Sequence, residues 1–106
     1  MATSIHKRAS AKRDLVEHYV YFAEHAGIEI AERFLLNADK SFEDLSRHPG
    51  MGVAVSLRSP KLDGLRRWPV IGFEKILIFY LPRAGGVSIV HVLHAAQDWW
   101  SLLGIL

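Results

Sequence analysis

The amino-acid sequence predicts an α+β fold, with the element order β-α-α-β-β-β and a helix hairpin packed on a small, mainly antiparallel sheet. Before residue 50 the apolar residues recur every three or four positions, which is the period of a helix buried on one side. After residue 64 they alternate or run continuously, as in half-buried and central strands. A chain of 106 residues has the length of a single domain, and we expect one domain over residues 1–106.

The first half is predicted to form two antiparallel helices. Ser10 offers a hydroxyl oxygen to the free amides of a helix start, and Gly27 can adopt the left-handed conformation that ends a helix. The apolar stripe between them consists of Leu15, Tyr19 and Phe22, with Val16, Val20 and Ala23 beside it. The second helix ends before Pro49 and has apolar residues at Ala31, Phe34, Leu35, Ala38, Phe42 and Leu45. So short a connection predicts a helix hairpin.

The strands follow from shorter patterns. Residues 3–8 predict a weak edge strand, and an antiparallel meander is predicted for residues 65–71 (LRRWPVI), 75–82 (KILIFYLP) and 87–94 (VSIVHVLH). Pro69 has no N–H to donate to a neighbouring strand, so the first meander strand is expected at a sheet edge or at a bulge. Asp98 can begin a short helical turn in the tail.

The composition excludes several classes of protein. The chain contains no cysteine, which excludes disulfides and zinc–thiolate sites and is typical of a reducing compartment. The N-terminal residues lack the apolar run of a secretory signal, and no apolar run approaches the ~20 residues of a membrane span. The net charge of +2 is smaller than nucleic-acid-binding domains usually carry. We therefore expect a soluble cytoplasmic protein that binds no membrane and does not itself bind nucleic acid.

The six histidines raise the question of a metal site, and their spacing argues against one. His91 and His94 point to opposite faces of a strand, while His18 and His25 lie two helical turns apart. We expect no metal and no cofactor. His94, at a strand end, has two interpretations: a half-buried histidine bonded to nearby backbone, or a general acid or base. The first is favoured, because no catalytic partner is visible beside His94.

Basic side chains supply further candidates. They gather at Arg58, Lys61, Arg66, Arg67 and Lys75. This set is compatible with binding phosphate oxygens, with binding the carboxylates of a partner protein, or with a solvated sheet edge. The sequence does not separate these three interpretations.

Two adjacent tryptophans, Trp99 and Trp100, stand near the C-terminal end. They cannot both point inward from one helix or strand, so at least one is expected to be exposed, as tryptophans in binding hot spots often are. The alternative is that one of them closes the core together with Leu102 and Leu103. We favour a surface that binds a partner protein.

Four stretches together are specific to one protein family: RASAKRDLVEHYVYFAE (8–24), AERFLLNADKSFEDLSRHPGMG (31–52), GLRRWPVIGFEKILIFYLP (64–82) and VSIVHVLHAAQDW (87–99). Through them nearly the whole chain resembles the ParE branch of the ParE/RelE toxin superfamily, the toxic halves of bacterial type II toxin–antitoxin modules. The HPGMG turn, the R-W-P-V…IFY run and the VLH…DW ending are more specific in combination than any one of them alone.

The resemblance implies a compact RelE/ParE-like domain and two protein partners. One is a ParD-like antitoxin with a DNA-binding ribbon-helix-helix end, which would wrap the toxin. The other is DNA gyrase, which ParE proteins characteristically poison, blocking replication and growth. We therefore expect a non-enzymatic gyrase inhibitor that meets nucleic acid only through these partners. The candidates for binding the target are Arg67, Trp68, His94, Asp98, Trp99 and Trp100. The candidates for binding the antitoxin are Leu15, Tyr19, Phe22, Phe34 and Phe42.

Two alternatives stay open. RelE-like relatives cut mRNA on the ribosome, using a basic set and a tyrosine or histidine–tyrosine pair near the end of the last strand. The corresponding set here would be Arg67, Lys75 and His94, but alanines follow His94 and no tyrosine follows Tyr80. Many relatives also read H-x-x-R-D where this chain has Gln97. A degenerate toxin that only binds its antitoxin is therefore the second alternative.

Overall fold

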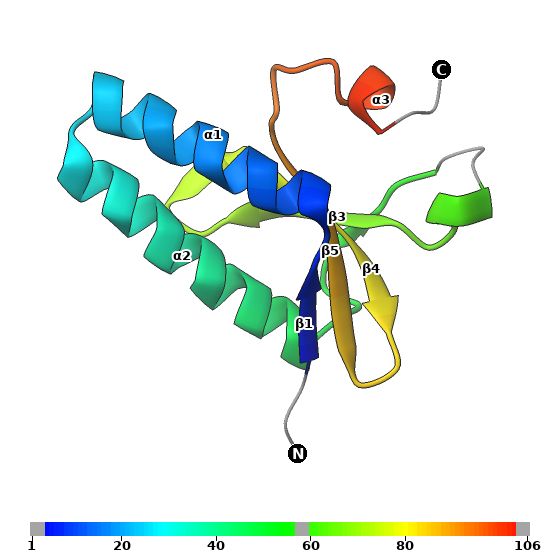
Figure 1. Cartoon of the computed structure of the whole chain (residues 1–106). Coiled ribbons are helices and arrows are strands. Elements are labelled where there is room, and N and C mark those ends of the chain that lie inside the picture. Colours follow the sequence, from blue (N-terminus) through cyan, green and yellow to red (C-terminus); the bar gives the residue numbers. More distant parts are fainter. Residues whose placement is uncertain (1–3, 57–59, 104–106) are drawn as a thin grey trace.

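The computed structural model describes residues 4–56 and 60–103 and has the predicted α+β architecture (Figure 1). Its elements are β1 (Ser4–Lys7), α1 (Ala9–His25), α2 (Ile28–Arg47), β2 (Val53–Ala54), the 3-10 helix η1 (Pro60–Leu62), β3 (Arg66–Val70), β4 (Phe73–Arg83), β5 (Gly86–His94) and α3 (Trp99–Leu102). The helix hairpin, the meander and the helical tail are confirmed. The sequence did not predict β2, because a strand of two residues has no recognisable alternation. Within the described ranges, no helix is long and apolar enough to cross a membrane.

The strands form one sheet in the order β1-β5-β4-β3-β2. β3, β4 and β5 are antiparallel neighbours, as predicted. β1 pairs with β5 in parallel, from Ser4 opposite Gly86 to Lys7 opposite Ile89. The edge position expected for residues 3–8 is therefore confirmed for Ser4–Lys7, while Thr3 lies outside the described residues.

Pro69 marks a bulge between β3 and β4. Pro69 pairs with Leu77, but the next residue, Val70, pairs with Phe73, so residues 74–76 of β4 lie between these two pairs. On its other side β3 is paired by β2 only at Arg66 and Arg67. The predicted bulge is confirmed. The predicted edge position holds only for Trp68–Val70, which pair with no described strand on that side.

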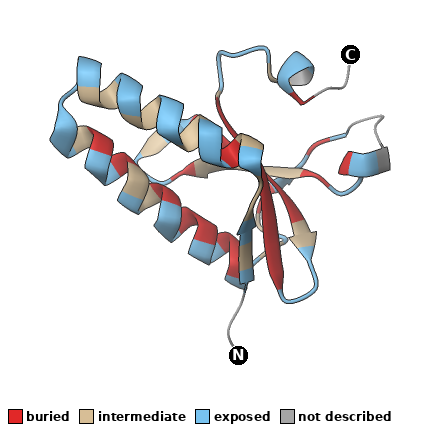
Figure 2. Ribbon diagram, viewed as in Figure 1, coloured by how far each residue is buried: buried red, intermediate tan, exposed pale blue. Residues whose placement is uncertain are grey.

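Apolar side chains cover both faces of the sheet, so that buried residues run along the central strands and the inner sides of the helices (Figure 2). The helix-side core comprises Ala11, Phe34, Ala38, Phe42, Leu45, Val70, Ile76, Ile78, Tyr80, Val87, Ile89 and Val92. The tail-side core comprises Val55, Leu62, Leu65, Leu77, Phe79, Leu81, Val90, Leu93 and Leu103. β4 alternates between the two cores, which explains why the sequence KILIFYLP is apolar on both faces.

The first helix begins differently from the prediction. Its first residue is Ala9, Arg8 precedes it, and no side chain caps it. The Ser10 hydroxyl instead donates a hydrogen bond to the Val90 carbonyl, with an O···O distance of 2.6 Å. The prediction that Ser10 caps the helix is therefore wrong, because β5 offers its side chain a partly buried acceptor that local sequence does not reveal.

Asp14 and His18 continue this contact along β5. The Asp14 carboxylate accepts hydrogen bonds from the Val92 amide at 2.9 Å and from His91 Nδ1 at 2.6 Å. His18 Nε2 donates to the Val92 carbonyl at 2.7 Å. The spacing of four residues places Ser10, Asp14 and His18 on one side of α1. Because β1 pairs with β5 only as far as Ile89, these side chains satisfy backbone groups of β5 beyond the end of β1 and close that edge to another strand.

Tyr80 fixes the connection that follows α2. Its side chain is fully buried, and its hydroxyl donates to the Pro49 carbonyl at 2.7 Å and accepts from the Gly52 amide at 3.0 Å. A Cβ atom at residue 52 would lie 2.8 Å from the Tyr80 ring and 2.9 Å from the Arg67 carbonyl oxygen. Glycine is therefore required at residue 52 by close approach, and the HPGMG turn is held against β4.

Tyr80→Phe is expected to lower the free energy of unfolding by about 1–3 kcal/mol at neutral pH, because the Pro49 carbonyl and the Gly52 amide lose their buried partner. Burial raises the pKa of Tyr80 above its usual 10.0, outweighing the hydrogen bond from Gly52 and the charge of Arg66, which lower it. The folded state therefore favours the neutral phenol. This stabilisation is fully present below pH 10 and is lost as the pH rises above 10 through the folded-state pKa.

Urea unfolding measured between about pH 7 and about pH 11 checks this prediction. The natural protein should lose the Tyr80 contribution at the alkaline end, and the Tyr80→Phe variant should not. Tyr21→Phe is the control, because the Tyr21 side chain is exposed. The same alkaline loss in the natural protein and in Tyr80→Phe would refute the assignment to Tyr80.

Candidate functional site

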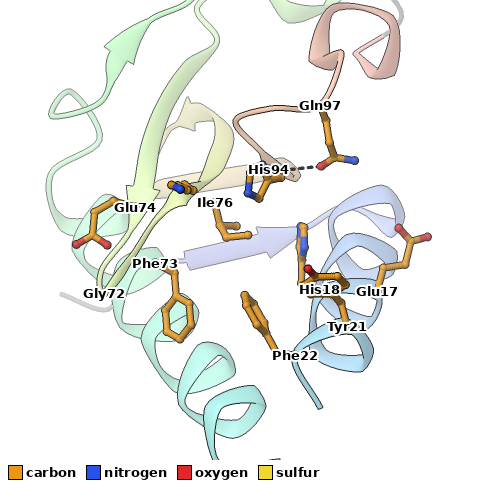
Figure 3. A pocket seen from close by; sticks show the side chains of 11 residues that line it. Glu17, His18, Tyr21, Phe22, Gly72, Phe73, Glu74, Ile76, His94 and Gln97 are labelled. Atoms are coloured by element: carbon orange, nitrogen blue, oxygen red, sulfur yellow. Dashed lines mark hydrogen bonds between the residues drawn. The ribbon is translucent and has the colours of Figure 1, made fainter. Parts of the chain in front are cut away.

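A cavity of about 640 Å³ lies between α1 and the end of the sheet where β4 begins and β5 ends (Figure 3). We call it the α1 cavity. It is lined by Glu17, His18, Tyr21, Phe22, Gly72, Phe73, Glu74, Lys75, Ile76, His94 and Gln97. Its volume falls within the range of about 300–1,000 Å³ that is typical of ligand sites.

Aromatic packing and the β4 bulge build the walls of the α1 cavity. The Phe22 and Phe73 ring centroids are 5.3 Å apart, and both rings pack against the buried Phe34. Gly72 makes the turn into β4 with a φ of +78°, a conformation that favours glycine. The bulge places Glu74 and Ile76 in the lining of the cavity. Bulges commonly re-aim side chains next to binding sites.

His94 projects into the α1 cavity from the end of β5 (Figure 3). Its Nδ1 accepts a hydrogen bond from the Ala96 amide at 3.0 Å. A neutral ring in this arrangement carries its proton on Nε2. The ring nitrogen that a general base needs is thus occupied by backbone. The sequence interpretation of His94 as a half-buried histidine bonded to nearby backbone is confirmed.

His18 faces the same cavity from α1 and was not predicted as a site residue (Figure 3). Its Nε2 must carry a proton, because its partner is the Val92 carbonyl oxygen, which only accepts. A neutral His18 ring therefore keeps Nδ1 as an acceptor. The signal that would have revealed this residue is the polar series Ser10, Asp14 and His18, with four-residue spacing on the inner side of a helix.

Gln97 closes the turn that follows β5. Its side-chain oxygen accepts a hydrogen bond from the His94 amide at 2.6 Å, and its own amide donates to the His94 carbonyl at 2.9 Å (Figure 3). An arginine, which the resemblance leads one to expect here, has no acceptor atom and cannot make the first of these bonds. The departure at Gln97 therefore has a structural role in this chain.

The structure does not bring the three candidate nuclease residues together. Lys75 and His94 both line the α1 cavity. Arg67 pairs with Phe79 of the tail-side core, whereas His94 pairs with Ile76 of the helix-side core. Directly paired residues share a face of the sheet, so Arg67 and His94 project from opposite faces.

The other target-binding candidates also fail to share one surface. Trp68 is half-buried and packs against the helix-side core, whereas Trp99 packs against the tail-side core with its ring 5.3 Å from that of Phe79. Asp98 precedes α3, as predicted, but its carboxylate accepts from the Ser101 hydroxyl at 2.8 Å and caps no amide. The Trp100 side chain lies outside the described part of the structure.

The antitoxin-binding candidates divide by burial. Leu15, Tyr19 and Phe22 are half-buried on α1. Phe34 and Phe42 are only 0% and 1% exposed and belong to the helix-side core, so they offer a partner no surface. For these two residues the structure corrects the prediction. The exposed large hydrophobic side chains of α1 are instead Val16, at 62%, Val20, at 45%, and Tyr21, at 57%.

Charged groups give no sign of a metal centre in the part of the chain that the structure describes. Within residues 4–56 and 60–103, no three histidine or acidic side chains come together as ligands would. The ion pairs found there are Lys7 with Asp39, at 3.6 Å, and His91 with Asp14. Glu17 and Glu74 therefore lie in the lining of the α1 cavity without a described salt-bridge partner, and their carboxylates point outward at its rim (Figure 3).

Comparisons with known proteins agree with the fold and identify the family. The family described as "ParE toxin of type II toxin-antitoxin system, parDE" matches residues 5–99. A solved structure, "Chromosomal ParDE TA system from P. aeruginosa", is similar with a TM-score of 0.66 and 16% sequence identity, over 87% of this chain and 95% of that chain. At this identity the likeness shows the fold alone. No curated protein sequence matches the chain. The family match covers most of the chain, which therefore belongs to the ParE toxins of type II toxin–antitoxin systems.

Proposed function

We propose that this ParE-type toxin acts by binding DNA gyrase and inhibiting it, and that a ParD-like antitoxin neutralises it. The observation that carries the choice of mechanism is the separation of Arg67 and His94 on opposite faces of the sheet. An mRNA endonuclease needs its basic and acid–base groups around one phosphate. The His94 nitrogen that accepts from Ala96 is also occupied. A toxin built this way is better suited to binding a protein than to cutting RNA, and the proposal places it in the cytoplasm with gyrase.

The proposed antitoxin contact uses α1 and a sheet edge. Val16 and Val20 leave an exposed apolar strip on α1, which suits the apolar side of an amphipathic segment. The edge of β5 beyond Ile89 is closed by side chains of α1. An added strand would therefore use the outer edge of β1 or the stretch Trp68–Val70. Hydrogen exchange of the complex should protect amides at one of these edges or along α1, and protection confined elsewhere would contradict the contact.

Purified toxin is expected to inhibit supercoiling by gyrase and to leave ribosome-bound mRNA intact. His94→Gln should inhibit gyrase about as strongly as the natural protein, because binding does not need a titratable ring, whereas a nuclease that uses His94 would be inactivated. The measurements are gyrase supercoiling and mRNA integrity with each protein, after thermal unfolding has shown that both are folded.

Two results would decide against this proposal, and a third would contradict only the expected tolerance of His94→Gln. Intact gyrase activity with codon-specific mRNA cleavage, abolished by His94→Gln, would make the toxin a RelE-like endonuclease. No effect on gyrase or on mRNA would leave antitoxin binding as the only activity. Inhibition of gyrase by the natural protein but not by folded His94→Gln would show that the ring itself is needed.

A further inference from the structure

The α1 cavity differs in charge from the rest of the molecule. The whole chain has a net charge of +2. The residues that line the cavity include two carboxylates (Glu17 and Glu74) and one ammonium group (Lys75). With neutral imidazoles, the lining therefore has a net charge of −1. Glu17 and Glu74 lie on opposite sides of the cavity, one on α1 and the other on the β4 bulge (Figure 3). Their carboxylates point outward, so a segment that crosses the cavity and extends past both rims passes one carboxylate on each side (Figure 3).

The interior of the α1 cavity combines aromatic surface with a matched pair of polar groups. Phe22 and Phe73 form its apolar wall, and the exposed Tyr21 extends this wall by stacking on His25 at a centroid distance of 4.3 Å. His94 retains an Nε2–H donor and His18 retains an Nδ1 acceptor, because their other ring nitrogens are bonded to backbone. One peptide group carries the complementary acceptor and donor.

We infer that the α1 cavity binds a basic segment of a partner protein. An apolar or aromatic side chain of the segment packs on Phe22 and Phe73, and a peptide group bonds to His18 and His94. Lysine or arginine side chains that flank this anchor point to Glu17 and Glu74. Aromatic side chains and arginine are the residue types most often found in binding hot spots. Charge complementarity selects this occupant over a nucleotide, because the lining has two carboxylates and one ammonium group and a phosphate would add further negative charge.

The inference rests on the α1 cavity alone and holds whether or not gyrase is the target. Its probe is the peptide Ac-Arg-Phe-Arg-NH2, titrated into the full-length 106-residue chain while backbone amide shifts are followed by NMR. Ac-Gln-Phe-Gln-NH2 removes the charges, and Ac-Arg-Ala-Arg-NH2 removes the anchor. The first peptide should shift residues around Phe22, Phe73 and His94, and should bind about three- to tenfold more tightly than either of the others.

Matched protein variants test the carboxylates. In the double variant Glu17→Gln with Glu74→Gln, the preference for the arginine peptide over the glutamine peptide should disappear. In the control variant, Glu24→Gln with Glu32→Gln, the preference for the arginine peptide should remain. Both of these residues are exposed on the helix hairpin, and neither lines the cavity. All four positions are solvent-exposed glutamates, so the folded state should be unaffected in both variants.

Several outcomes would overturn the inference. These are the absence of shifts in the cavity, equal affinity for the charged and neutral peptides, and an equal response of the two double variants. Binding of adenosine monophosphate to the same residues, without binding of the arginine peptide, would assign the α1 cavity to a nucleotide instead.

Discussion

Asp14→Ala is expected to lower the free energy of unfolding by about 3–5 kcal/mol, because one carboxylate holds two donors of β5. Asp14 accepts from His91 Nδ1 and from the Val92 amide, and its side chain is only 13% exposed. Without the carboxylate, α1 keeps the hydrogen bonds of Ser10 and His18 to β5 but loses the two of Asp14, and both donors remain partly buried without that partner. For a domain of this size the midpoint of thermal unfolding should fall by more than about 10 °C.

Asp39→Ala is the matched control for this prediction. Asp39 also lies on a helix and forms one ion pair, with Lys7, but its side chain is 62% exposed. Exposed pairs contribute about 0–1 kcal/mol, so the control should unfold nearly as the natural protein does. Asp14→Asn should lie between the two, because its amide oxygen can replace Oδ2 as the acceptor of both hydrogen bonds but carries no negative charge. Equal unfolding temperatures for Asp14→Ala and Asp39→Ala would show that the contact to β5 does not stabilise the fold.

Trp99→Ala is expected to cost about 2–3 kcal/mol of stability, less than a fully buried tryptophan would. The half-buried ring packs on Phe79 and, with Leu103, helps the tail to cover the tail-side core. Loss of the ring should therefore loosen the tail, which calorimetry would detect as a lower unfolding temperature. Leu102→Ala is the control on the same short helix, because Leu102 is 46% exposed and should cost little.

The same variant separates a structural role of Trp99 from a role in binding the target. If the ring mainly closes the core, gyrase inhibition by Trp99→Ala should fall only in proportion to the unfolded fraction. A variant that stays as stable as the natural protein but no longer inhibits gyrase would instead make Trp99 a docking residue. The sequence favoured a docking surface for the tryptophan pair, and the packing of Trp99 on Phe79 supports the closure alternative for this member.

The sequence alone determined the element order, the helix hairpin and the meander. These depend on local signals: helical spacing before Pro49, continuous apolar runs in β4 and β5, and a missing N–H donor at Pro69. The interpretation of His94 as bonded to nearby backbone was also within reach, because its partner, Ala96, is only two residues away. Contacts between residues this close along the chain can be predicted from a single sequence.

The tertiary structure decided what depends on contacts between distant residues. The Ser10 hydroxyl donates a hydrogen bond to β5 instead of capping its own helix, and Asp14 bonds to His91 across a separation of 77 residues. The sheet register alone separates Arg67 from His94, and the packing of α1 on the sheet leaves Val16 and Val20 exposed although their spacing matches a buried stripe. Glu17 and Glu74 come to share the α1 cavity for the same reason. The physical cause is that helical and strand periods specify which side of an element is apolar, whereas register and packing specify which distant residue meets it.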